Sequence, residues 1–290
     1  MRAWIAYFTV AIVWGSTYLG VALGITSFTP YGLVAGRYLA AGIIALALCR
    51  LSGQDFPARR DVPHLVLQGV LQLTCTNALI AWAQGSVSSG AAAVLSSTTP
   101  LFYAILGREH LDARRWTGLA LGLAGVGFLV LSRSGAQTVS PVGALALLTG
   151  SFLWACGTLH GRRHVRSGGL MGQVGVQMTT GGLLAACLAP LFGGFVHAPL
   201  TWKAGLAVAY LALFGSLVAY SAFVYISRVW PPTRMSTYVY INPVVAVLLG
   251  CIVLKEAFTL NMVLAMAVIL AGVALLQTKR RRQGAQCRPI

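Results

Sequence analysis

Residues 235–254 read MSTYVYINPVVAVLLGCIVL, a stretch of twenty residues without a charge. A helix of about 20 mostly apolar residues is long enough to cross the hydrocarbon core of a bilayer. Nine more apolar segments occur outward from this stretch, and the ten together lie at about 4–25, 31–51, 64–84, 88–106, 115–132, 140–160, 171–195, 203–227, 235–254 and 259–277. The sequence therefore predicts an all-α membrane protein with ten transmembrane helices.

The composition leaves little of the 290-residue chain for anything but membrane helices. Apolar residues make up 57% of it and charged residues 9%, whereas soluble domains carry about 25% charged residues. The connections are too short for a separate soluble domain. The first apolar segment, at 4–25, lacks a clean cleavage site and is interpreted as an uncleaved first helix.

The basic residues orient the ten segments. Of the 21 Lys and Arg residues, seventeen fall on the side that holds both termini, while Arg133, Lys203 and Lys255 fall on the other and Arg37 lies inside the second segment. Because cytoplasmic loops carry the excess of Lys and Arg, both termini are predicted to be cytoplasmic. The net charge of +16 then reflects topology and anionic lipid headgroups, and no nucleic-acid partner is expected.

Cysteines and histidines give no sign of a prosthetic group. Five of the six cysteines lie within or at the end of apolar segments without close pairs, as small packing residues do. The five histidines lie near segment ends or in loops, where an interfacial position is expected; they are His64, His110, His160, His164 and His197. We expect no cofactor and no metal site.

The two halves of the chain share a set of spacings. Trp14 matches Trp154, and 23 residues further on Arg37 matches Gln177. Asn77 lies 23 residues before Pro100, as Tyr220 lies 23 residues before Pro243. The predicted units are a first repeat at 1–137, a second repeat at 138–278 and a basic cytoplasmic tail at 279–290. With five helices each, the repeats must enter the membrane from opposite sides, as in many secondary transporters.

The halves differ in length at one place. Nine residues separate Pro100 from Glu109, whereas thirteen separate Pro243 from Glu256. The missing four residues are close to one helical turn. The fourth segment is therefore expected to be short or to end deeper in the membrane.

Five motifs carry a resemblance to a known family. They are WGSTYLG (Trp14–Gly20), SSTTPLF (Ser96–Phe102), GLALGLAGV (Gly118–Val126), AYLALFGS (Ala209–Ser216) and INPVVAVLLG (Ile241–Gly250). In this order they resemble the EamA-type branch of the drug/metabolite transporter superfamily. The resemblance implies two EamA repeats, export of small organic metabolites such as amino acids, and a central cavity lined by segments 1, 3, 4, 6, 8 and 9.

Neutral polar and aromatic side chains on those segments are the candidates for substrate binding. They are Trp14, Ser16, Tyr18, Asn77, Trp82, Thr99, Tyr103, Trp154, Thr158, Tyr220, Tyr238 and Asn242. Such a set suits an amphipathic small-molecule pocket. Alternatively, the hydroxyls bond to their own helices and the aromatic rings form interfacial belts. Trp14, Asn77, Trp154, Tyr220 and Asn242 are the strongest candidates, since they lie at matched or motif positions.

Three further residues have two interpretations each. Arg37 either binds a substrate carboxylate in the cavity or extends to the interface as a structural cation. Pro100 and Pro243 lie at matched places, where a proline kinks a helix. They are either conformational hinges or static bends.

The predicted function is a secondary transporter, most simply an exporter of small organic metabolites such as amino acids or drug-like compounds, working by alternating access in the inner membrane. A channel-like facilitator and a lipid or phosphorylated-solute translocator remain the alternatives. All five acidic residues lie in loops or at segment ends, so a carboxylate proton relay is not expected. No catalytic constellation is visible, and the protein is not expected to be an enzyme. The expected partners are a small-molecule substrate and the lipid bilayer, with the chain a monomer or weak homodimer.

Overall fold

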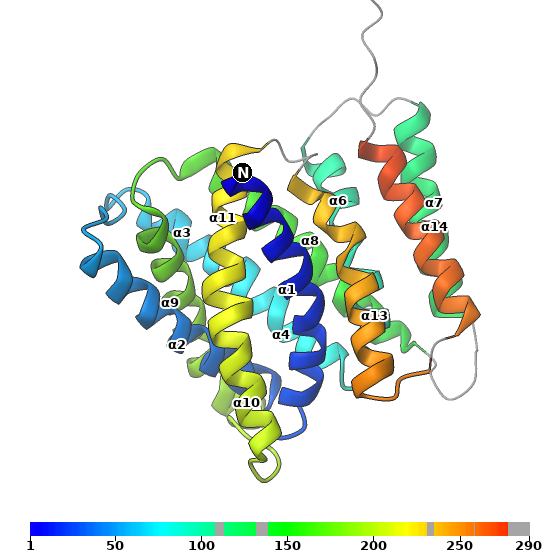
Figure 1. Ribbon diagram of the computed structural model, residues 1–290, viewed down its shortest axis with the longest axis horizontal. Coiled ribbons are helices and arrows are strands. Elements are labelled where there is room, and N and C mark those ends of the chain that lie inside the picture. The colour runs from blue at the N-terminus through cyan, green and yellow to red at the C-terminus, as the bar shows by residue number, and fades with distance from the viewer. Residues whose placement is uncertain (108–112, 132–138, 231–234, 258, 278–290) are drawn as a thin grey trace, which may run out of the picture.

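The computed structural model describes residues 1–107, 113–131, 139–230, 235–257 and 259–277, and these residues are helical with short connections (Figure 1). The elements run in order α1 (Arg2–Gly24), α2 (Pro30–Leu51), α3 (Val62–Gln68), η1 (Gly69–Cys75), α4 (Thr76–Ala83), α5 (Ser89–Ser96), α6 (Thr99–Leu106), α7 (Ala113–Leu131), α8 (Pro141–His164), α9 (Leu170–Leu188), η2 (Ala189–Phe192), α10 (Trp202–Tyr210), η3 (Leu211–Val218), α11 (Ala219–Val229), η4 (Ser236–Tyr240), α13 (Asn242–Val253) and α14 (Leu260–Gln277). Strands are absent from this described part, apart from an isolated bridge between Phe28 and Val196.

Eight helical stretches are long and apolar enough to cross a membrane. They are Arg2–Gly24, Pro30–Leu51, Val62–Ala83, Ser89–Leu106, Pro141–His164, Leu170–Phe192, Trp202–Val229 and Ser236–Val253. Two shorter apolar helices, Trp116–Leu131 and Leu260–Leu275, lie within α7 and α14. The chain is therefore an all-helical, multi-pass membrane protein, and the count of ten spans with cytoplasmic termini stays a prediction.

Several helices begin at residues that cap them. The side chains of Thr29, Ser88, Ser140 and Thr201 each accept a hydrogen bond from a backbone N–H in the first turn of the helix that follows. Such caps satisfy N–H groups that have no partner inside the helix. The caps fix where α2, α5, α8 and α10 start.

The helices associate in a pattern that mirrors the two predicted repeats. α1 packs against α10, η3, α11 and α13, whereas α8 packs against α3, η1, α4, α5 and α6. The first helix of each predicted half therefore packs mainly against helices of the other half. On the flanks, α2 packs along α9 and α7 along α14, and the latter pair stands to one side of the bundle in Figure 1. The boundary predicted at 137 and 138 lies outside the described residues.

Glycines permit the close approach of these flanking helices. A Cβ on Gly182 of α9 would lie 2.7 Å from the backbone nitrogen of Leu39 in α2. A Cβ on Gly272 of α14 would lie 2.6 Å from the carbonyl oxygen of Gly118 in α7. Small residues at such crossings are a common way for membrane helices to pack.

The third and eighth predicted segments each change helix type at matched places. Both contain a π-helical stretch, η1 and η3, which ends two residues before Asn77 in one case and two residues before Tyr220 in the other. In η1 two carbonyl groups also accept hydrogen bonds from side chains, in one case beside a backbone N–H. Thr76 Oγ1 donates to the Leu71 carbonyl at 2.8 Å, and Asn77 Nδ2 donates to the Gln72 carbonyl at 2.8 Å. π-Helical turns frequently occur at functional sites.

The two prolines proposed as hinges also lie at helix discontinuities. Pro100 is in the first turn of α6, which starts after a two-residue break behind α5. Pro243 is in the first turn of α13, which follows the 3₁₀ helix η4. α6 ends six residues after its proline and α13 ten residues after its own. Glu109, on which the predicted one-turn difference partly depends, lies outside the described residues.

Candidate functional site

A cavity of about 90 Å³ lies between the helices that pack around α1 and those that pack around α8. Because one buried water needs roughly 10–15 Å³ of such space, the cavity has room for more than one water. Its walls come from α1, α2, α4, α5, α6, α8, η3, α11, η4 and α13. Residues from both predicted halves therefore meet around one space.

Nine of the residues predicted from the sequence to bind substrate line this cavity. They are Trp14, Tyr18, Arg37, Asn77, Thr99, Trp154, Tyr220, Tyr238 and Asn242. All five of the strongest candidates are in this group. Their positions make them candidates for substrate contact.

Four predicted residues lie away from the lining. Trp82 is 51% exposed on the outside of α4. Ser16 faces Tyr210, with its hydroxyl 2.5 Å from the Tyr210 hydroxyl. Tyr103 and Thr158 are buried together, and the tyrosine hydroxyl donates to Thr158 Oγ1 at 3.1 Å.

The cavity also has lining residues that were not among the predicted set. They are Thr17, Val21, Tyr38, Thr76, Ile80, Ala93, Ser96, Ser97, Ser151, Gly215 and Val239. Helical spacing was the available signal for some of them. On α1 the lining positions follow the i, i+3, i+4, i+7 pattern of one helix face, so Trp14 and Tyr18 imply Thr17 and Val21.

Arg37 supplies the positive charge of the cavity wall. It is 4% exposed, so its side chain does not extend to the surface. Its Nε donates to Ser216 Oγ at 3.0 Å, and its Nη1 donates to Asn77 Oδ1 at 3.4 Å. The guanidinium lies 4.6 Å from the centre of the Tyr38 ring. No Asp or Glu is among the described residues that line the cavity, so the Arg37 charge has no carboxylate partner among them.

A network of neutral polar groups meets the cavity wall at Tyr220. The Tyr220 hydroxyl contacts the side-chain amide oxygens of Gln72, at 3.1 Å, and of Gln177. Gln72 Nε2 donates to Thr158 Oγ1 at 2.7 Å, and this threonine also accepts from Tyr103. The pair of Gln177 and Tyr220 occupies the positions that match Arg37 and Asn77. Each predicted half therefore joins its second and third segments by a matched polar contact.

Three polar atoms at the cavity have no hydrogen-bond partner in the described part of the chain, and one of them is the Ser96 hydroxyl oxygen. Trp154 Nε1 is a buried donor, and Asn242 Oδ1 is a buried acceptor. In contrast, Trp14 Nε1 donates to the Gly215 carbonyl at 3.1 Å. A buried polar group without a partner is costly. The free donor and acceptor are therefore available to a bound solute or to water.

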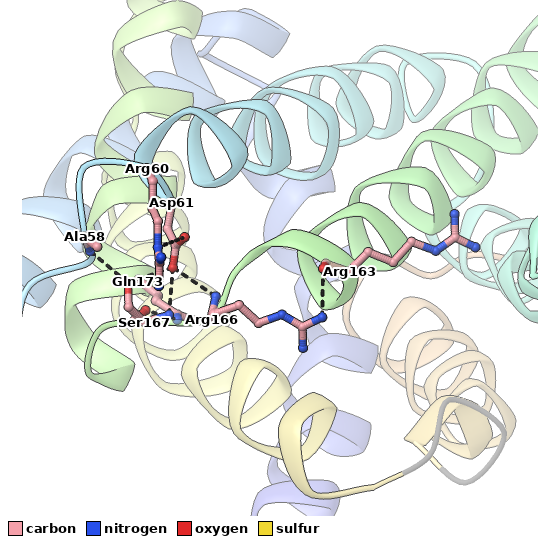
Figure 2. A network of polar contacts seen from close by, with 7 residues as sticks. All are labelled: Ala58, Arg60, Asp61, Arg163, Arg166, Ser167 and Gln173. Atoms are coloured by element: carbon pink, nitrogen blue, oxygen red, sulfur yellow. Dashed lines mark hydrogen bonds and ion pairs between the residues drawn. The ribbon is translucent and has the colours of Figure 1, made fainter.

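Opposite ends of the bundle are held by contacts between the predicted halves. At one end, the Glu256 carboxylate accepts from the backbone N–H groups of Ser89, at 2.8 Å, and Gly90, at 3.3 Å. At the other end, the buried Asp61 carboxylate accepts from the N–H groups of Arg166, at 2.9 Å, and Ser167, at 2.7 Å, and from the Ser167 hydroxyl at 2.7 Å (Figure 2). These contacts lower the pKa of Asp61, the Ser167 hydroxyl most of all.

A multi-pass helical bundle around a cavity lined by polar and aromatic side chains defines a membrane protein that can hold a small molecule among its helices. The chain belongs to the EamA-like transporter family, whose model matches residues 1–131 and 141–278. It is therefore a membrane transporter of the EamA type.

Individual relatives agree with this family. The chain is 36% identical to the uncharacterized inner membrane transporter YedA of Escherichia coli K12, over 93% of this chain and 89% of that protein. It is 24% identical to a probable terminal-alkyne amino-acid exporter of Streptantibioticus cattleyicolor, over 97% of this chain and 95% of that protein. A crystal structure with 22% identity shares the fold at a TM-score of 0.65, covering 94% of this chain and 95% of its own.

Proposed function

We propose that this protein is a secondary transporter of the inner membrane. It exports small organic acids that carry an apolar group able to pack against aromatic rings, amino acids foremost. The observation that carries the proposal is the buried Arg37 guanidinium, which lies on the cavity wall without a carboxylate beside it. A buried charge is stabilised when it is paired, and a substrate carboxylate would complete the pair through charge-assisted hydrogen bonds.

The rest of the cavity suits the remaining parts of such a substrate. Trp154 Nε1 offers a hydrogen-bond donor and Asn242 Oδ1 an acceptor, and the acceptor would suit an ammonium or amide group. The rings of Trp14, Trp154 and Tyr238 line the same space and would pack against an apolar group. The Streptantibioticus relative is named a probable terminal-alkyne amino-acid exporter, which supports this substrate class and the outward direction.

We further propose ten spans in two inverted repeats, with both termini in the cytoplasm. α7 has 19 residues and α14 has 18, which correspond to about 28 and 27 Å of helix, close to the roughly 30 Å of the hydrocarbon core. Counting both as spans preserves the distribution of Lys and Arg described above. Matched π-helical stretches, matched prolines and matched polar contacts support the repeat.

Alternating access is the proposed mechanism. The helix breaks at Pro100 and Pro243 would serve as hinges at matched places, and the contacts of Glu256 and Asp61 would close the two ends in turn. Since no acidic residue lines the cavity, coupling through a buried carboxylate is not proposed. The protein would act as a facilitator or exchanger, as a monomer or weak homodimer in the bilayer.

Transport by the purified protein in liposomes tests this function. Vesicles loaded with an unlabelled amino acid should accumulate the labelled one by counterflow, with a rate that saturates, and without an imposed proton gradient. A channel-like facilitator would show no counterflow. Uptake of phosphorylated solutes or lipid movement, in place of amino acids, would favour the alternative translocator. Direction is tested by whether an overexpressing strain resists toxic amino-acid analogues.

A further inference from the structure

Three histidines from two helices meet where α3 packs against α8. His64 lies in the first turn of α3, and His160 and His164 lie one turn apart at the end of α8. Their ligand-forming nitrogens all lie within 4.8 Å of one another. In the sequence these residues were expected only as interfacial side chains, because His64 is nearly a hundred positions from the other two.

One pair of these nitrogens, joined by a hydrogen bond, already has the spacing of two ligands on one ion. His64 Nδ1 and His160 Nε2 are 3.1 Å apart. Two nitrogens bound at 2.0–2.1 Å to a tetrahedral zinc ion lie about 3.3 Å from each other. Two histidines at i and i+4 on one helix face are also the arrangement by which helical metal sites hold their ion.

The third ring is held in the tautomer that metal binding requires. His164 Nδ1 lies 2.9 Å from the His160 carbonyl oxygen, which can only accept, so Nδ1 carries the hydrogen. This leaves Nε2 of His164 with a free lone pair. Metal-binding histidines commonly have their other nitrogen bonded to a carbonyl in this way.

We propose that His64, His160 and His164 form a binding site for a divalent transition-metal ion, with Zn²⁺ the best fit. Three imidazoles and an open fourth position are a known zinc arrangement, and imidazole ligands suit Zn²⁺, Ni²⁺ and Cu²⁺ better than Mg²⁺ or Ca²⁺. The nearby Asp61 carboxylate is already bonded to Arg166 and Ser167, so the ligand set is uncharged. The ion would link a helix of the first predicted half to one of the second.

Metal binding to the full chain in detergent, purified through an affinity tag without histidine, tests the site. Calorimetric titration with Zn²⁺ should show one equivalent bound, and Co²⁺ should give the visible absorption of a tetrahedral ion. Both His64→Ala and His164→Ala should weaken binding at least tenfold. His197→Ala, in the loop after η2, is the matched control and should bind as the unmodified chain does.

A second readout separates loss of ligand from loss of fold. Saturating Zn²⁺ should raise the thermal unfolding temperature of the unmodified chain, because an ion that binds only the folded state stabilises it. The exposed His164 can be replaced without disturbing the core, so His164→Ala should keep its metal-free unfolding temperature while losing the shift. Binding that is absent in the unmodified chain, or unchanged in His164→Ala, would overturn the three-histidine site.

Discussion

Trp14 and Trp154, at matched positions of the two predicted repeats, pack edge to face with ring centroids 5.2 Å apart and planes at 90°. Both rings line the cavity, so the pair joins the first helix of each predicted half at the place where a solute would bind. Edge-to-face packing is a favoured geometry for aromatic rings. The two indole N–H groups differ, since one is bonded to the backbone and the other is free.

This difference predicts opposite effects for two equal substitutions. Trp154→Phe removes a donor that has no partner in the described residues, so the unfolding temperature should change little while substrate affinity falls about tenfold, the value of one hydrogen bond. Trp14→Phe removes the bond to the Gly215 carbonyl and should cost about 1 kcal/mol of stability. Counterflow half-saturation and thermal unfolding of both variants check the prediction. Equal half-saturation for Trp154→Phe and the unmodified chain would count against substrate contact at Nε1.

Arg37 should discriminate between charged and neutral substrates. A hydrogen bond to a charged group contributes about 1.5–3 kcal/mol, so Arg37→Gln should lower transport of a carboxylated substrate roughly 10- to 150-fold. The amide of the same substrate should lose far less. Rates of both compounds in liposomes give the comparison.

The control for Arg37 is available on the same helix. Arg50→Gln changes an exposed arginine in the last turn of α2 and should leave both rates unchanged. Equal losses for the acid and the amide in Arg37→Gln, with less protein in the membrane, would assign Arg37 to structure through Ser216 and Asn77.

Glu256 should matter for stability more than for energy coupling. Its carboxylate accepts two N–H groups at the start of α5, where negative charge is favourable, so Glu256→Gln should cost about 1–2 kcal/mol. Counterflow by the folded protein should persist. Asp55→Asn, an exposed acid in a loop, serves as the control. Loss of all counterflow in folded Glu256→Gln, together with a need for a proton gradient, would show that this carboxylate carries protons.

Asp61 should make folding sensitive to acid. Because its pKa is lowered in the folded protein, the contacts in Figure 2 stabilise the fold above the ordinary carboxyl value of 3.8 and are lost as the pH falls through and below it. Asp61→Asn should be less stable near neutral pH and should show a smaller decline in unfolding temperature on acidification. Parallel declines in the two proteins would mean that other groups dominate the acid response.

Positions matched between the two halves were informative about the cavity. Equivalent residues of a repeat take equivalent places in the fold, whatever the sequence around them. Spacing within one helix explains the misplaced residues. Trp82 is five residues after Asn77, which is about 140° around the helix from it, whereas Ile80, three residues on, shares its face. Ser16 is two residues after Trp14 and likewise points away, toward Tyr210.

Other features depended on contacts that no spacing in the sequence reveals. Tyr103 and Thr158 lie one turn beyond Thr99 and Trp154 on their own helices, so they meet behind the cavity instead of lining it. The approach of His64 to His160 results from the packing of α3 on α8. The π-helical stretches have no compositional signature that separates them from α-helix, so the extra residue in each widened turn could not be predicted from the sequence.

The paired π-helical stretches have a consequence for how this chain tolerates insertion and deletion. Each holds more residues in a turn than an α-helix does, so removing a single residue from η1 or η3 would let the backbone return to the α form. The residues after the deletion would then keep their orientation, with Asn77 or Tyr220 still on the cavity wall, whereas a deletion in an ordinary α-helical part of the same segment would turn the following residues by about 100°. The widened turns are therefore the places on these two segments where the loss of one residue is best tolerated.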